Sequence, residues 1–119
     1  MFDVRRSIIA RAAYDAIIVD LRITGSYPKD ALQELANLKH LMNDVHGAAL
    51  TWEDLAGTAE TFGDPATELD ARFKAALLFQ ESHDKRAVAL QVARIRQLLK
   101  SPVIPDDAKE RVERQIRNY

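Results

Sequence analysis

The side chains best suited to metal binding or proton transfer in this sequence are its three histidines, His40, His46 and His83. Histidines that share a metal ion on one helix usually stand four residues apart or in Glu-x-x-His pairs, and neither spacing occurs here. The absence of cysteine excludes disulfides, thiol catalysis and thiolate metal sites. We therefore predict no metal and no cofactor, and we expect the histidines on the surface.

Motifs of nucleophilic catalysis and phosphate binding are also missing. No Gly-x-Ser-x-Gly elbow occurs, and the four glycines are too far apart for a Walker or Rossmann loop. The adjacent carboxylates Glu53 and Asp54 fall in an expected first helical turn, where capping and the helix dipole explain them. Asp20 lies among apolar residues near the expected end of a helix, where we expect it to reach water or pair with an arginine. We predict that the protein is not an enzyme.

The longest segment available to position side chains runs over residues 64–100. After Pro65 it holds no proline or glycine until Pro102. Asp64 suits the N-cap and Pro65 the first helical position, while Lys100 suits a helix C-terminus. The sequence therefore predicts an all-α fold, a five- or six-helix bundle or orthogonal array around a long central helical stretch.

A bend or break is expected within that stretch, near residues 82–84. The run from Gln80 to Arg86 has no apolar residue, and the apolar stripe changes phase across it. Ser82 or Asp84 could cap a new helix there. The alternative is one continuous rod that changes packing partner along its length.

Shorter helices are expected on both sides of this stretch, and no strand or internal repeat is apparent. Their expected ranges are 3–23, 28–45 with Gly47 as the stop, 51–62 with Thr51 as the cap, and 106–117. The first is apolar on most sides, so we expect it to be buried, either as a central helix or at a subunit interface.

Composition and length indicate one domain, residues 1–119, with ordinary globular character. No segment is apolar enough for a transmembrane helix, and the N-terminal residues do not resemble a signal peptide, so we expect a cytoplasmic protein. Charge is uneven along the chain. Residues 85–119 hold nine basic and four acidic residues, a net +5, and residues 1–84 hold eight and fourteen, a net −6.

Two classes of function remain. The first is a non-enzymatic protein–protein interaction or regulatory module, a small helical subunit or adaptor that self-associates as a homodimer or binds another protein. Its candidate partner contacts are Trp52, Phe62, Glu53 and Asp54, since large aromatic residues often anchor interfaces. The alternative is nucleic-acid binding by the basic C-terminal third. The candidate contacts for that function are Arg94, Arg96, Lys100, Arg111, Arg114 and Arg117.

Overall fold

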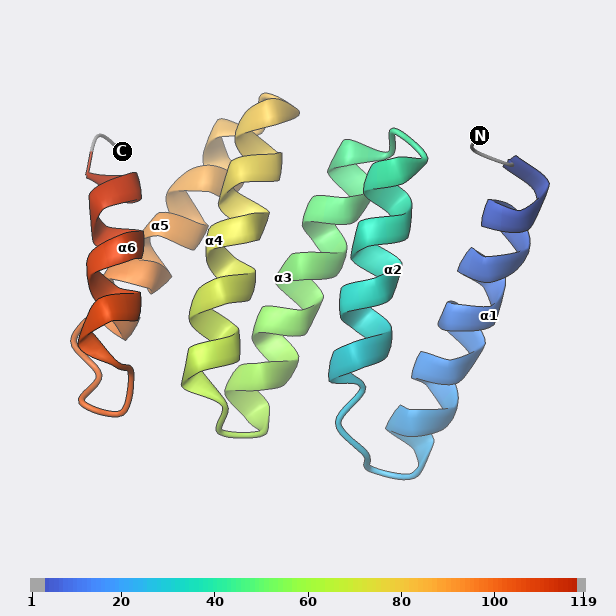
Figure 1. The fold of residues 1–119 in the computed structure, drawn as a ribbon, viewed down its shortest axis with the longest axis horizontal. Coiled ribbons are helices and arrows are strands. Elements are labelled where there is room, and N and C mark those ends of the chain that lie inside the picture. Colours follow the sequence, from blue (N-terminus) through green and yellow to red (C-terminus); the bar gives the residue numbers. More distant parts are fainter. Residues whose placement is uncertain (1–3, 118–119) are drawn as a thin grey trace.

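A computed structural model of the chain describes residues 4–117, and these residues form helices and connecting turns without any strand (Figure 1). The all-α prediction is therefore confirmed, with six helices in the described part. In chain order they are α1 (Val4–Ile23), α2 (Lys29–Leu41), α3 (Val45–Thr61), α4 (Pro65–Glu81), α5 (Lys85–Leu98) and α6 (Asp106–Ile116).

The helices stand in a row that runs from α1 at one end to α6 at the other (Figure 1). Close backbone contacts join each helix from α1 to α5 to the next one in the chain, and they are most extensive between α3 and α4. Small side chains let these two helices approach. Six alanines of α3 and α4 are completely buried: Ala48, Ala49, Ala56, Ala59, Ala71 and Ala75. The main core therefore lies in the middle of the row, with a second apolar cluster under α6.

Three of the turns between helices are built alike and recur every 20 residues. In each, a residue with positive φ ends one helix and the next residue, an aspartate, caps the following helix. The positive-φ residues are Asn43, Gly63 and His83. The side chains of Asp44, Asp64 and Asp84 accept hydrogen bonds from the amides of Gly47, Thr67 and Ala87. This recurrence is an internal repeat that the sequence prediction missed.

The backbone of these turns closes each helix in the same way. The amide of each capping aspartate donates to a carbonyl five residues earlier at 2.9 Å, in the pattern of a Schellman motif. The predicted break near residues 82–84 is confirmed, since α4 ends at Glu81 and His83 takes φ 63°. The alternative of one continuous rod is wrong.

The boundary between α2 and α3 differs from the prediction. The helix that starts near Pro28 ends at Leu41 rather than Val45, because Asn43 takes the left-handed conformation that usually selects glycine. Gly47 is no stop: it lies in the first turn of α3. Thr51 is no cap either, since it lies inside α3 and its hydroxyl donates to the Gly47 carbonyl at 2.9 Å.

A buried polar network ties α3, α4 and α5 together. Glu68 of α4 is 1% exposed, and its carboxylate accepts hydrogen bonds from Arg94 of α5 at 2.8 and 3.1 Å and from Arg72 at 3.0 Å. Arg72 also donates to Gln91 at 3.1 Å, and Gln91 in turn donates to Glu53 of α3.

No helix among residues 4–117 is both long and apolar enough to cross a membrane.

Candidate protein-interaction site

The outer side of α1 presents a line of exposed apolar side chains, which we call the α1 stripe. Its members are Ile9, Ala12, Ala16, Val19 and Ile23. Ile9, Val19 and Ile23 are 69%, 55% and 78% exposed. Their successive spacings of three, four, three and four residues keep all five on one face, as in the contact seam of a coiled coil. The stripe thus has the spacing of a helix-packing face, and its side chains are exposed in the described chain.

The opposite side of α1 explains why the stripe is left uncovered. Only Ser7 and Ile18 are buried in α1, and Tyr14 packs against the core on the same side. Because α1 stands at the end of the row, it contacts α2 on this side and no helix of the described chain covers the other (Figure 1). The expectation that α1 is a central helix is wrong, and the expectation of a subunit interface stays a prediction.

Charged side chains beside the stripe differ in sign between the two halves of α1. Arg5, Arg6 and Arg11 lie in the N-terminal half, and Asp15 and Asp20 in the C-terminal half. Asp20 is exposed to solvent, as expected. The one basic residue of the C-terminal half, Arg22, is held by Asp54 of α3 through a 2.7 Å ion pair.

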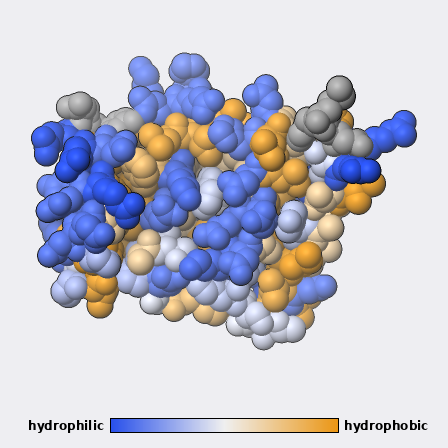
Figure 2. Space-filling view, in the orientation of Figure 1, coloured by the Kyte–Doolittle hydropathy of each residue, from blue (hydrophilic) through white to orange (hydrophobic). Residues whose placement is uncertain are grey.

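A hollow of about 430 Å³ lies between α1 and α3 and adjoins the stripe at Val19. Ile18, Leu32 and Leu35 contribute apolar side chains to it, and the half-exposed Leu50 adds another. Polar and charged side chains line the rest of the hollow, so its surface is mixed: Asp15, Arg22, Lys39, Thr51 and Asp54. In Figure 2, hydrophilic residues dominate the α6 end of this face, whereas hydrophobic residues are exposed across its middle and at the α1 end.

The predicted aromatic contacts lie away from the stripe. Trp52 is 5% exposed in the core, with Lys74 Nζ 4.6 Å from the centre of its ring, so it offers a partner little surface. Phe62 is half exposed and stacks on Tyr27, with ring centroids 4.8 Å apart. One face of Phe62 is thus already covered within the chain.

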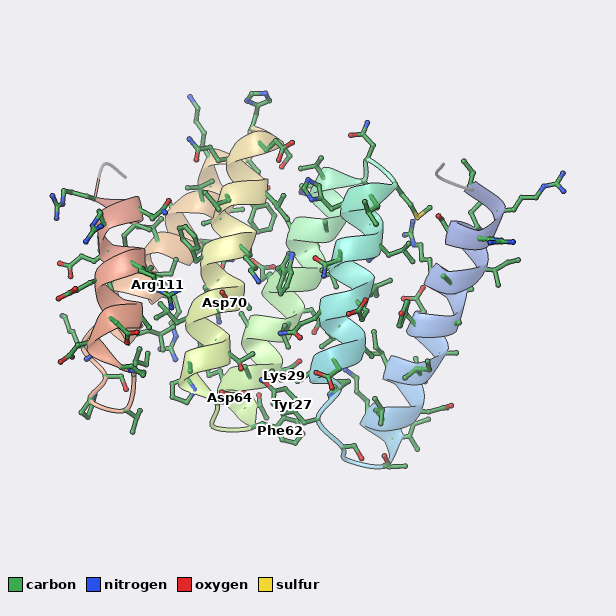
Figure 3. All side chains as sticks on the ribbon, in the orientation of Figure 1. Tyr27, Lys29, Phe62, Asp64, Asp70 and Arg111 are labelled. Atoms are coloured by element: carbon green, nitrogen blue, oxygen red, sulfur yellow. The ribbon has the colours of Figure 1, made fainter. Side chains whose placement is uncertain are left out.

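Tyr27 belongs to a cluster that joins the α1–α2 turn to the α3–α4 turn (Figure 3). Its hydroxyl donates to Asp64 Oδ2 at 3.1 Å, and Lys29 Nζ lies 3.9 Å from the same oxygen. Burial and the bond to Asp64 raise the pKa of Tyr27 to about 12. Burial alone would raise the pKa of Asp64, but hydrogen bonds from Thr67 and Tyr27 outweigh it and lower that pKa. These groups stabilise each other and fix the turns.

The predicted acidic contacts are likewise engaged within the chain. Glu53 accepts a hydrogen bond from Gln91, and Asp54 pairs with Arg22.

The network around Glu68 is also poorly suited to acid–base catalysis. Burial alone would raise the pKa of Glu68, but hydrogen bonds from Arg94 and Arg72 hold it below its ordinary value. A carboxylate in that state is a weak base and stays ionised near neutral pH.

The six basic residues of the alternative function are spread over separate places. Arg94 is bound to Glu68 and lies 3.3 Å from Glu60, inside the network. Arg111 and Asp70 line opposite sides of a hollow between α6 and α4 (Figure 3). Arg114 is exposed on α6. The remaining three residues line another hollow of about 430 Å³ between α5 and α6: Arg96, Lys100 and Arg117, together with Glu113.

Two histidines near the α2–α3 turn lie close to acidic residues near the α4–α5 turn. His40 Nε2 lies 4.0 Å from Glu81, and His46 Nε2 lies 3.6 Å from Asp84. His83 occupies the left-handed position of the α4–α5 turn. No three His, Asp or Glu side chains among residues 4–117 gather closely enough to hold a metal ion.

The candidate interaction residues that sequence reasoning missed are those of the α1 stripe. The apolar positions that nearly encircle α1 suggested burial on most sides, which concealed the spacing of three and four within them. That spacing was the available signal. Comparison of the chain with protein families, with curated proteins and with solved structures finds no match.

Proposed function

We propose that this chain is a non-enzymatic protein–protein interaction module, a small helical subunit that self-associates through the outer face of α1. The single observation that carries the proposal is the α1 stripe, whose apolar side chains are exposed at coiled-coil spacing along a helix of 20 residues. A helix of that length spans about 30 Å, enough for several layers of side-chain contacts. We also propose a cytoplasmic location, with which a chain that forms no disulfides is compatible.

Two features of the chain support this function. Exposed apolar residues that are contiguous, rather than scattered singly, are typical of interaction surfaces in folded proteins. The rest of α1 is anchored: Ile18 is buried, Arg22 pairs with Asp54, and Arg11 lies 3.8 Å from Asp44. The stripe is therefore presented by a helix that is already held in place, which lowers the entropic cost of docking.

The test compares two aspartate variants of α1 by sedimentation velocity. Val19→Asp places a charge in the stripe, whereas Ile17→Asp places the same charge on the same helix at a half-exposed position outside it. We expect the wild type and Ile17→Asp to sediment as a dimer or larger species, and Val19→Asp to sediment as a 13.4 kDa monomer with unchanged helix content. A monomeric wild type, or a Val19→Asp variant that assembles like the wild type, would contradict the proposal.

A second candidate function is nucleic-acid binding at the α6 end of the row. The observation that favours it is the hollow between α5 and α6, which is lined by Arg96, Lys100 and Arg117 together with one acidic residue, Glu113. Three cations in one depression can contact neighbouring phosphates. The rival explanation is local, because Lys and Arg near the ends of helices are stabilised by the helix dipole.

Fluorescence anisotropy with a labelled DNA duplex and a labelled single-stranded RNA tests this candidate. Binding through phosphates should weaken steeply with salt, and the triple variant Arg96→Gln, Lys100→Gln, Arg117→Gln should abolish it. A matched triple variant of Lys29, Lys74 and Lys85 removes the same charge elsewhere and should retain binding. Equal loss in both triple variants would indicate a nonspecific charge effect and would remove this candidate.

A further inference from the structure

The sequence and exposure of α1 also bear on which partner helix the stripe accepts and in which direction that helix runs. We infer that the partner is α1 of a second copy of this chain, docked antiparallel along the stripe. This inference rests on the proposed self-association and specifies its geometry. It follows from how the stripe pairs with itself and from the charges on its two sides.

Antiparallel docking uses every position of the stripe. The core positions of a coiled coil alternate between two types, called a and d. When the two helices are antiparallel, each a residue of one helix lies opposite a d residue of the other. Ile9 then faces Val19 of the second copy, and Ala12 faces Ala16. Each layer thus pairs a large side chain with a large one or a small with a small. The small central layers let the two helices approach closely, and the larger layers on either side fill the remaining space.

The last position of the stripe, Ile23, faces Arg5 of the second copy in this arrangement. The aliphatic stem of an arginine can cover an apolar neighbour while its guanidinium group stays in water. No apolar side chain of the stripe is then left without a counterpart.

Charges beside the stripe favour the same direction. On one flank, antiparallel docking brings Arg6 of each copy next to Asp20 of the other, which makes two attractive pairs. Parallel docking would instead bring Asp15 of each copy next to Asp20 of the other and would gather the basic N-terminal halves together. It would also align the two helix dipoles unfavourably. The other flank of the antiparallel pair has one repulsive contact, between the two Asp15 side chains, and Arg11 lies one helical turn from each of them.

Engineered cysteines distinguish the two directions without background, because the chain has no cysteine of its own. The variants are Ile9→Cys and Val19→Cys, each oxidised alone and as an equal mixture, with Val103→Cys in the exposed α5–α6 connection as the control. In the antiparallel dimer the two different cysteines face each other, whereas two identical cysteines are offset by about 15 Å along the helix. Disulfides require Cα atoms within about 7 Å.

The antiparallel arrangement predicts disulfide-linked dimers in the mixture and none beyond the Val103→Cys level in either variant alone. Cross-linking of each variant alone, without an increase on mixing, would show a parallel dimer and overturn this inference while leaving the proposed function intact. Absence of cross-links from all samples would overturn both, whether sedimentation shows a monomer or a dimer that forms through another face.

A charge reversal provides a second test whose sign depends on the direction. Asp20→Arg places two arginines together in the antiparallel dimer but creates an attractive pair with Asp15 in a parallel one. We expect the variant to weaken dimerisation by about five- to tenfold, and the double variant Arg6→Asp, Asp20→Arg to restore it. Tighter dimerisation of Asp20→Arg would overturn the antiparallel arrangement.

Discussion

Replacing the buried carboxylate of Glu68 with an amide perturbs the network that holds α3, α4 and α5 together. Glu68 accepts three charge-assisted hydrogen bonds, two from Arg94 and one from Arg72. Breaking a buried ion pair costs about 3–5 kcal/mol because it leaves a charge without compensation. Arg72 keeps its bonds to Gln91 and Glu60, and Arg94 keeps its contact with Glu60. We therefore expect Glu68→Gln to lower the free energy of unfolding by about 3 kcal/mol, the lower end of that range.

The pH dependence of this loss provides an internal check. The pKa of Glu68 in the folded chain lies below its ordinary value of 4.5. Its contribution to stability is therefore fully present well above pH 4.5 and is lost as the pH falls below 4.5 through the folded-state pKa. The gap in unfolding free energy between the wild type and Glu68→Gln should be largest near neutral pH and should shrink in acid.

Urea unfolding followed by far-ultraviolet circular dichroism measures the loss of unfolding free energy in Glu68→Gln and the dependence of this loss on pH. The exposed Glu34→Gln on α2 serves as the matched control, for which we expect a change within about 0.5 kcal/mol. A loss below about 1 kcal/mol for Glu68→Gln, or a gap that stays constant from neutral to acidic pH, would refute the reasoning about the buried network.

Three further substitutions test the turns. Tyr27→Phe keeps the stack on Phe62 but removes the bond to Asp64, so it should cost about 1 kcal/mol in urea unfolding. Because the pKa of Tyr27 is raised to about 12, stability should fall as the pH rises from 10.0 toward that value, and spectrophotometric titration of Tyr27→Phe should lack the transition near pH 12 that the wild type shows. His83→Gly should raise the thermal midpoint, since it relieves about 1 kcal/mol of left-handed strain. Gly63→Ala, at the equivalent position of the α3–α4 turn, should lower the midpoint by a similar free energy, and shifts of the same sign in both variants would contradict the shared geometry.

Local sequence signals predicted much of the fold. The Asp64–Pro65 start and the polar run from Gln80 to Arg86 marked the boundaries of α4, because capping and loss of apolar periodicity act within a few residues. The α2–α3 boundary was missed because Asn43 is a less distinct stop than glycine. Gly47 was misread for the opposite reason, since glycine is a common stop but is tolerated in a first helical turn.

The long-range features could not be predicted from local signals. Glu68 and Arg94 are 26 residues apart, and Glu53 and Gln91 are 38 apart, so their contacts depend on how three helices pack. The exposure of the α1 stripe depends on the place of α1 at the end of the row. Apolar residues around a helix have the same pattern whether a neighbouring helix of the same chain or another subunit covers them.

The solution mass of the wild-type chain, measured by light scattering at low and high salt, tests most directly whether the α1 stripe is an interface. At about 1 M salt the Debye length is about 3 Å, so exposed ion pairs are largely screened while apolar contacts persist. A stripe that drives association predicts a dimer at both salt concentrations. A 13.4 kDa monomer at both, or a dimer that dissociates at high salt, would contradict an apolar interface on α1.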